Sequence, residues 1–81
     1  MYRFVLDGEA VAMLIQCTLE EQAKLAQAFE QLARHPFPHG LATMLDGDGR
    51  ENFIIRLNEF LVTFRHDHAV GEIRVADIDR I

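Results

Sequence analysis

The strongest constraint on the fold is a change in the spacing of apolar residues near Gly40. Before this point Leu25, Phe29 and Leu32 recur three and four positions apart, which is the period of an amphipathic helix. After it, large apolar residues occupy every second position over residues 53–57 and 60–64, which is the period of a strand. The sequence therefore predicts the α+β class, with N-terminal helices packed on a C-terminal antiparallel sheet.

The first forty residues predict a strand followed by a helical hairpin. Thr18 and Glu21 are spaced as in a capping box, so we expect a long helix to start at Thr18. Pro36 ends it, because proline disfavours helical backbone at the preceding residue. Asp7 is placed to cap a shorter helix before it. The predicted elements are a strand at residues 2–6, a first helix with apolar positions Ala10, Met13, Leu14 and Cys17, a second helix at residues 18–34 with apolar positions Leu25, Ala26, Phe29, Leu32 and Ala33, and a loop at residues 36–40.

The remaining residues predict an antiparallel meander. Strands are expected at residues 41–45, 53–57, 60–65 and 72–78, with turns at 46–49 and 58–59 and a loop at 66–71. Full burial of a large apolar side chain stabilises a fold by about 1.5–3 kcal/mol, so these strands and the helical stripe could form one core, in a single domain spanning residues 1–81. The strand residues on the face toward the helices are Phe53, Ile55, Leu57, Phe60, Val62 and Phe64.

Composition narrows the classes of function. The 81-residue chain has a formal net charge of −5, whereas nucleic-acid-binding proteins usually carry a basic excess. The longest apolar run, residues 10–15, is far too short to span a bilayer, and the first residues lack the pattern of a signal peptide. Cys17 is the one cysteine, which is typical of a reducing compartment. We therefore expect a cytoplasmic protein that does not act on membranes.

The order of the predicted elements resembles the RelE/ParE superfamily of toxins from bacterial type II toxin–antitoxin (plasmid-stabilisation) systems. Three segments carry the resemblance: DGEAVAMLIQC (7–17), LAQAFEQLARHP (25–36) and FIIRLNEFLVTFRHDHAVGEIRVADI (53–78). Together they cover nearly the whole chain. The resemblance implies the RelE-like fold and an antitoxin that wraps the toxin; it also implies that the chain, if it is an enzyme, is an mRNA endoribonuclease.

The chain departs from the family at the cationic positions. In the family pattern one hairpin strand reads Tyr-Arg-x-Arg and the next opens with Tyr-Arg; here Ile54 and Leu61 stand at two of the arginine positions, and only Arg56 is kept. The C-terminal Gly-His-Arg becomes residues 79–81, Asp-Arg-Ile, and the lysine-rich segment before the hairpin is acidic. These losses weigh against RNA cleavage, in which cationic groups stabilise the phosphorane.

Two groups of candidate site residues follow, both on the sheet face away from the helices. Arg56 and Arg65 are the catalytic candidates, or they are solvated arginines that pair with Glu72 or Asp67. Ile54, Leu61 and Thr63 are the candidate partner-binding residues, because an apolar patch on an uncovered face often marks an interface. The alternative is that residues 36–45 or a tail cover this patch.

Three other patterns give weaker evidence for a functional site. His66 and His68, two apart on a strand, would share a face, yet two ligands do not make a metal site. The Asp46-Gly47-Asp48-Gly49 segment begins like a calcium loop but lacks the bidentate glutamate at its twelfth position, so it reads as a turn. Cys17 is expected to be a buried packing residue. We expect no metal and no cofactor.

Two classes of function remain open. The first is a toxin of a toxin–antitoxin module, acting on ribosome-bound mRNA or on a protein such as gyrase. The charge supports neither the ribosome and mRNA nor gyrase, although a gyrase-binding mode needs no catalytic residues. The second is a non-catalytic binding or regulatory protein of the same fold, with an antitoxin or a second copy of itself as partner.

Overall fold

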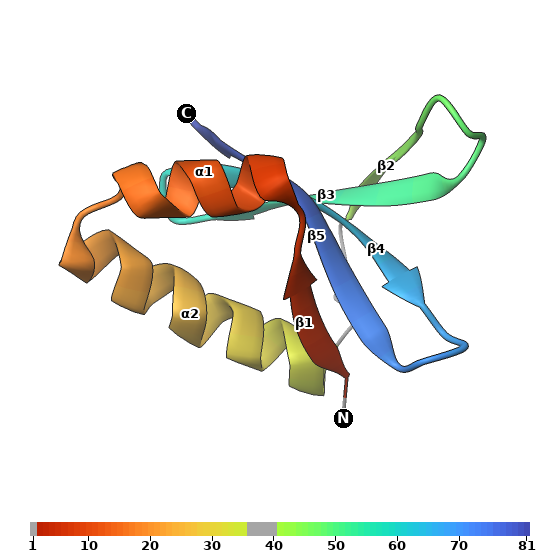
Figure 1. The fold of residues 1–81 in the computed structure, drawn as a ribbon, viewed down its shortest axis with the longest axis horizontal. Coiled ribbons are helices and arrows are strands. Elements are labelled where there is room, and N and C mark those ends of the chain that lie inside the picture. Colours follow the sequence, from red (N-terminus) through yellow and green to blue (C-terminus); the bar gives the residue numbers. More distant parts are fainter. Residues whose placement is uncertain (1, 36–40) are drawn as a thin grey trace.

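Two helices lie on one face of a five-stranded sheet in the computed structural model, which describes residues 2–35 and 41–81 (Figure 1). Across the sheet the strands are ordered β1-β5-β4-β3-β2. This arrangement confirms the predicted α+β class and the helical hairpin; the predicted loop at residues 36–40 lies outside the described residues. Along the chain the elements are β1 (Arg3–Leu6), α1 (Gly8–Gln16), α2 (Leu19–Arg34), β2 (Ala42–Leu45), β3 (Glu51–Leu57), β4 (Phe60–Asp67) and β5 (Glu72–Arg80).

The sheet is mixed. Strands β2 to β5 form the predicted antiparallel meander, and β1 extends it by pairing in parallel with β5, from Arg3 opposite Glu72 to Leu6 opposite Val75. A parallel pair needs a long crossover between its strands, and here the crossover comprises both helices and strands β2 to β4. In Figure 1, β1 and β5 lie side by side, close to α1. No helix in the described ranges is long and apolar enough to cross a membrane.

The capping box predicted at the start of α2 is confirmed. The Thr18 hydroxyl accepts from the Glu21 N–H at 3.1 Å, and the Thr18 N–H donates to the Glu21 carboxylate at 2.9 Å. The prediction for Asp7 is wrong. Asp7 stands at the N-cap of α1 but caps nothing with its side chain, because its carboxylate accepts from the Arg74 guanidinium on β5 at 3.0 Å.

The buried stripe of α2 differs from the prediction at one position. Leu25, Phe29, Leu32 and Ala33 are buried as expected, but Ala26 is exposed. Gln22 is half-buried in addition, and its amide donates to the Leu14 carbonyl at 2.8 Å. This bond ties α2 to α1.

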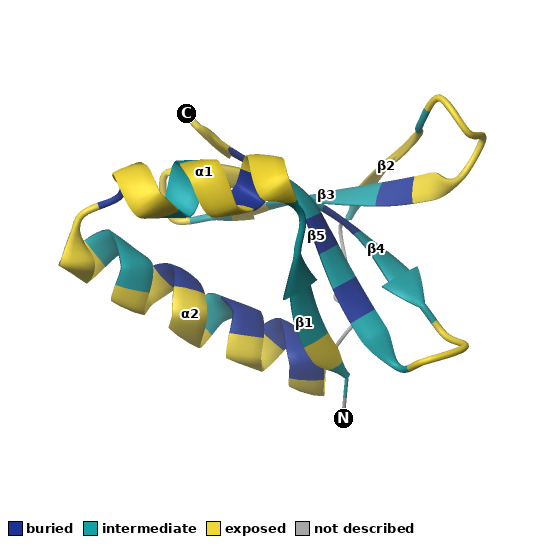
Figure 2. Cartoon of the chain, viewed as in Figure 1, coloured by how far each residue is buried: buried dark blue, intermediate teal, exposed yellow. Residues whose placement is uncertain are grey.

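The core lies between the helices and the inner face of the sheet, as the dark blue segments of Figure 2 show. Phe60, Val62 and Phe64 on β4 are fully buried there, which confirms the predicted face. Phe53, Ile55 and Leu57 on β3 point to the same face and pack against the core, yet they stay partly exposed because the helices lie over β1 and β5. Cys17 is buried at the end of α1, as predicted.

The last two strands are longer than predicted. Strand β4 runs to Asp67, so the predicted loop at 66–71 shrinks to a turn, and β5 runs to Arg80 rather than to Ile78. Their pairing shifts register in the middle: Thr63 lies opposite Asp77, but Phe64 lies opposite Val75. Ala76 is thus an extra residue on β5, and this β-bulge reverses the faces of the residues that follow it.

Candidate functional site

The candidate site is the face of the sheet that points away from both helices. Because Phe60, Val62 and Phe64 point inward, Leu61 and Thr63 between them point outward, together with the residues paired to them. Two rows of paired residues cross this face from the β2 side to the β5 side. They are Ala42, Ile54, Thr63 and Asp77 in the first row and Arg56, Leu61 and Asp79 in the second, and we call these residues the open face.

The structure brings together all three predicted partner-binding residues. Ile54 lies opposite Thr63, and Leu61, which is 40% exposed, lies one row away on the same strand as Thr63. Strand β2 sits beside β3 at the edge of the sheet, so described residues of the 36–45 segment extend this face rather than cover it.

Two acidic residues of the open face were missed by the sequence analysis. Asp77 and Asp79 face outward because the bulge at Ala76 moves Ile78 to the inner face, where it is buried. A signal for this existed: Ile73 and Val75 are two apart, whereas Val75 and Ile78 are three apart, and this break in the alternation marks the extra residue.

The two aspartates perturb one another. The pKa of the Asp79 carboxyl is raised, first because neighbouring atoms partly desolvate it and second because the Asp77 carboxylate lies close by. Asp77 accepts from the Ile78 N–H at 3.0 Å. Within residues 2–35 and 41–81 neither carboxylate forms an ion pair.

The two catalytic candidates do not share a site. Arg56 lies on the open face, opposite Leu61, and its Nε donates to the Asn58 carbonyl at 3.1 Å. Arg65 lies on β4 opposite Arg74, four residues beyond Leu61, the partner of Arg56. At about 3.3 Å per residue, this places Arg65 roughly 13 Å from Leu61 along the strand. Neither arginine pairs with Glu72 or Asp67; Glu72 instead binds Arg3 at 3.0 Å and Arg74 at 3.7 Å.

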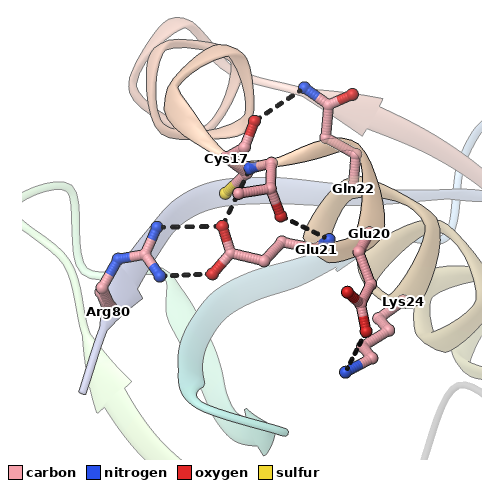
Figure 3. Close-up of polar contacts among 7 residues, drawn as sticks. Cys17, Glu20, Glu21, Gln22, Lys24 and Arg80 are labelled. Carbon is pink, nitrogen blue, oxygen red and sulfur yellow. Dashed lines mark hydrogen bonds and ion pairs between the residues drawn. The ribbon is translucent and has the colours of Figure 1, made fainter.

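The arginine near the C-terminus is turned to the other side of the sheet. Arg80 lies opposite Phe60, with its guanidinium 5.0 Å from the centre of that ring, and both its terminal nitrogens donate to the Glu21 carboxylate. Figure 3 shows this forked pair between the end of β5 and the first turn of α2. The pair lowers the pKa of Glu21 to about 2, chiefly through the hydrogen bond from Arg80, and raises that of Arg80.

The histidine pair lies at a fork in the sheet. The β3–β4 ladder begins at Phe53 opposite Phe64, and beyond it the strands diverge around a hollow of about 490 Å³. The His66 and His68 rings stack in parallel at 5.6 Å, so the two share a face as predicted, and the Tyr2 hydroxyl lies 2.8 Å from His68 Nδ1. No cluster of three or more metal-ligating side chains occurs in the described part of the chain.

Chemically, the open face suits contact with protein. Its centre is apolar or neutral, its β5 margin carries two carboxylates, and its one guanidinium lies at the opposite end of the second row. Within these two rows a phosphodiester would meet two negative charges and a single cation, whereas phosphate binding and phosphoryl transfer need several. The next cations on this side of the sheet, Arg65 and Arg74, lie beyond the bulge.

Comparison with known proteins agrees with this architecture. No protein-family model matches the chain, and no curated protein matches it in sequence. Solved structures of toxin–antitoxin complexes do match. The archaeal RelE–RelB complex from Pyrococcus horikoshii gives a TM-score of 0.78 at 13% identity, covering 98% of this chain and 93% of the matched one.

In two further complexes the matched chain is covered over almost its full length. A RelBE complex from Mycobacterium tuberculosis gives a TM-score of 0.80 at 17% identity, covering 99% of this chain and 98% of the other. The intact E. coli RelBE toxin–antitoxin complex gives a TM-score of 0.73 at 12% identity, covering 100% of this chain and 98% of the matched one. At these identities the likeness concerns the fold, and it confirms the one that the sequence segments implied: the chain has the RelE fold.

Proposed function

We propose that this chain is a toxin-like protein of a toxin–antitoxin module, that a RelB-type antitoxin is its partner, and that it acts by binding protein and not by cutting RNA. The fold supports the first two parts, because each of the three matched structures is a complex of a RelE-fold chain with an antitoxin.

The composition of the open face supports the third part. Ile54 and Leu61 occupy positions where the family pattern has arginine, and Asp77 and Asp79 lie beside them. Arg80, which follows Asp79 in the sequence, is held on the helix side by Glu21. This loss of positive charge from one surface is the observation on which the proposal rests.

The cleavage part is tested by incubating the purified protein with translating ribosomes and mapping mRNA ends. We expect no site-specific cuts, with an active RelE toxin as the positive control. Site-specific cuts that disappear in an Arg56→Ala variant would overturn it.

The partner part is tested by inducible expression with growth monitoring, with and without the product of the adjacent small reading frame. We expect the adjacent product to co-purify with the chain and to relieve any growth defect. If it neither binds nor alters growth, the toxin–antitoxin assignment fails.

A second candidate, self-association, is favoured by a separate surface. Val11 and Ile15 lie one turn apart on α1, Leu19 is the first residue of α2, and the three are 38, 74 and 84% exposed. Exposed large apolar side chains often mark protein contacts. Light scattering of the purified chain and of an Ile15→Lys/Leu19→Lys variant tests this: a dimer that the variant makes monomeric supports it, and a monomeric parent excludes it.

A further inference from the structure

Several acidic groups of the molecule are paired with arginines. Glu21 is bound by Arg80 on the helix side, and Asp7 and Glu72 are bound by Arg74 of β5. On the open face, Asp77 and Asp79 have no ion pair with any described residue, although they lie close enough to one another to repel. Two neighbouring carboxylates without a cation are a local excess of negative charge that a partner's cations can neutralise.

This negative charge lies at one margin of the open face, on β5. Read from β3 to β5, the first row passes from Ile54 through Thr63 to Asp77, and the second passes from Arg56 through Leu61 to Asp79. Each row therefore ends in a carboxylate at β5 and has an apolar side chain one or two strands away from it. A partner that matches both rows needs apolar groups near the middle of the sheet and cations at one margin.

We propose, building on the proposed function, that the open face receives a basic amphipathic helix of the partner protein, which crosses β3, β4 and β5. Its apolar side chains cover Ile54 and Leu61, and its lysine or arginine side chains meet Asp77 and Asp79. The partner segment is thus basic, as a chain with a net charge of −5 requires for electrostatic complementarity.

The spacing of the rows matches that of a helix. Neighbouring strands lie about 4.8 Å apart, so Ile54 and Asp77 are separated by roughly 9.6 Å. Two turns of helix, from position i to i+7, rise about 10.5 Å. Leu61 and Asp79 are one strand apart, which corresponds to one turn, from i to i+3 or i+4. The expected partner pattern therefore has apolar residues one turn apart, followed by basic residues on the next turn.

Arg56 fixes the direction of this pattern. It lies at the β3 end of the second row, with Leu61 between it and Asp79. Basic residues of the partner are repelled at the β3 end and attracted at the β5 end. The cations must therefore follow the apolar residues toward β5, and the reverse placement is disfavoured.

The first experiment uses alanine-based helical peptides as probes. One peptide carries two leucines one turn apart and two lysines on the following turn; a matched peptide carries glutamates in place of the lysines. Titration of each into the intact chain by calorimetry should give at least about ten-fold tighter binding of the lysine peptide, weakening as salt is raised. Equal binding of the two peptides overturns the proposal.

A charge-reversed variant separates the open face from the net charge. Asp77→Lys/Asp79→Lys should reverse the preference, so that the glutamate peptide binds more tightly. Glu20→Lys/Glu30→Lys on the exposed side of α2 makes the same change in net charge and should retain the preference for lysine. If both variants behave alike, the attraction is to the whole molecule and the proposal falls. A Leu61→Gln variant, which changes a residue that is 40% exposed, should weaken the binding of both peptides.

The binding surface is then located by amide chemical-shift mapping. The lysine peptide and the adjacent-frame product should both shift Ile54, Leu61 and Asp79 and leave residues 19–34 unchanged. If the adjacent product binds and shifts α2 instead, the toxin–antitoxin proposal stands and this inference fails. If the adjacent product does not bind but the lysine peptide maps to the open face, the inference stands and the toxin–antitoxin proposal fails.

Discussion

The two faces of the sheet use one strand in opposite ways. Phe60, Val62 and Phe64 of β4 are buried under the helices, whereas Leu61 and Thr63, which alternate with them, lie on the open face. Charges differ as well: on the helix side Glu21 is paired with Arg80, whereas Asp77 and Asp79 of the open face form no ion pair with any described residue. The helix side therefore contributes most of the folding stability, whereas the open face contributes little to it and can bind a partner.

The largest expected effect tests whether stability resides on the helix side. Phe29 on α2 is buried, and its ring lies 5.3 Å from that of Phe4 on β1. Phe29→Ala should cost about 3–5 kcal/mol of unfolding free energy, since it removes a large core side chain. Leu61→Ala on the open face should cost less than about 1 kcal/mol. Urea denaturation of both variants measures the difference, and equal losses would remove the distinction between the faces.

A smaller loss is expected at the start of α2. Thr18→Ala removes the hydroxyl that accepts from the Glu21 N–H, and loss of such a cap costs about 1 kcal/mol. Thermal unfolding should show a lower Tm for this variant. Gln27→Ala, an exposed position on the same helix, is the matched control and should change stability by less than about 0.5 kcal/mol. An unchanged Tm for Thr18→Ala would mean that the first turn is held by Arg80 alone.

Acid titration tests the pair between Glu21 and Arg80. The pKa of Glu21 is lowered from 4.5 to about 2 in the folded chain, so its ionised form favours folding. That stabilisation is complete above pH 4.5 and is lost as the pH falls toward 2. Glu21→Gln should therefore flatten the fall in stability over this pH range. Urea denaturation at several pH values measures the unfolding free energy of the parent chain and of the variant.

Arg80→Gln provides the second arm of this titration. It removes the largest cause of the low Glu21 pKa and should flatten the profile in the same range, although Glu21 itself is retained. A profile for Arg80→Gln that is as steep as that of the parent chain would show that the pair does not link β5 to α2 in solution.

The sequence predicted local features well and long-range ones less well. The capping box at Thr18 and the inward face of β4 are set by residues close in sequence, and both are as expected. The parallel pairing of β1 with β5 joins the two ends of the chain, and no local pattern specifies it. Asp7 was misread for the same reason, since its partner Arg74 is remote in sequence.

The candidate site was predicted in part. Strict alternation along β3 and β4 placed Ile54, Leu61 and Thr63 together, because one hairpin fixes their register. Asp77 and Asp79 were missed because a single extra residue, Ala76, changes the face of everything after it. Arg65 was grouped with Arg56 because alternation gives the face of a residue but not its distance along the strand.

The smallest expected effect concerns the open face itself. Because the pKa of Asp79 is raised in the folded chain, its ionised form disfavours folding, and stability falls as the pH rises through this carboxyl's titration range. Asp79→Asn should therefore be neutral or stabilising at pH 7, by about 0.5 kcal/mol or less at so exposed a position. Urea denaturation at pH 7 measures this, with Asp48→Asn, in the β2–β3 turn and beside Arg50, as the control that should not stabilise. A destabilised Asp79→Asn variant would mean that this carboxylate supports the fold, and the reason to assign it to a partner would be gone.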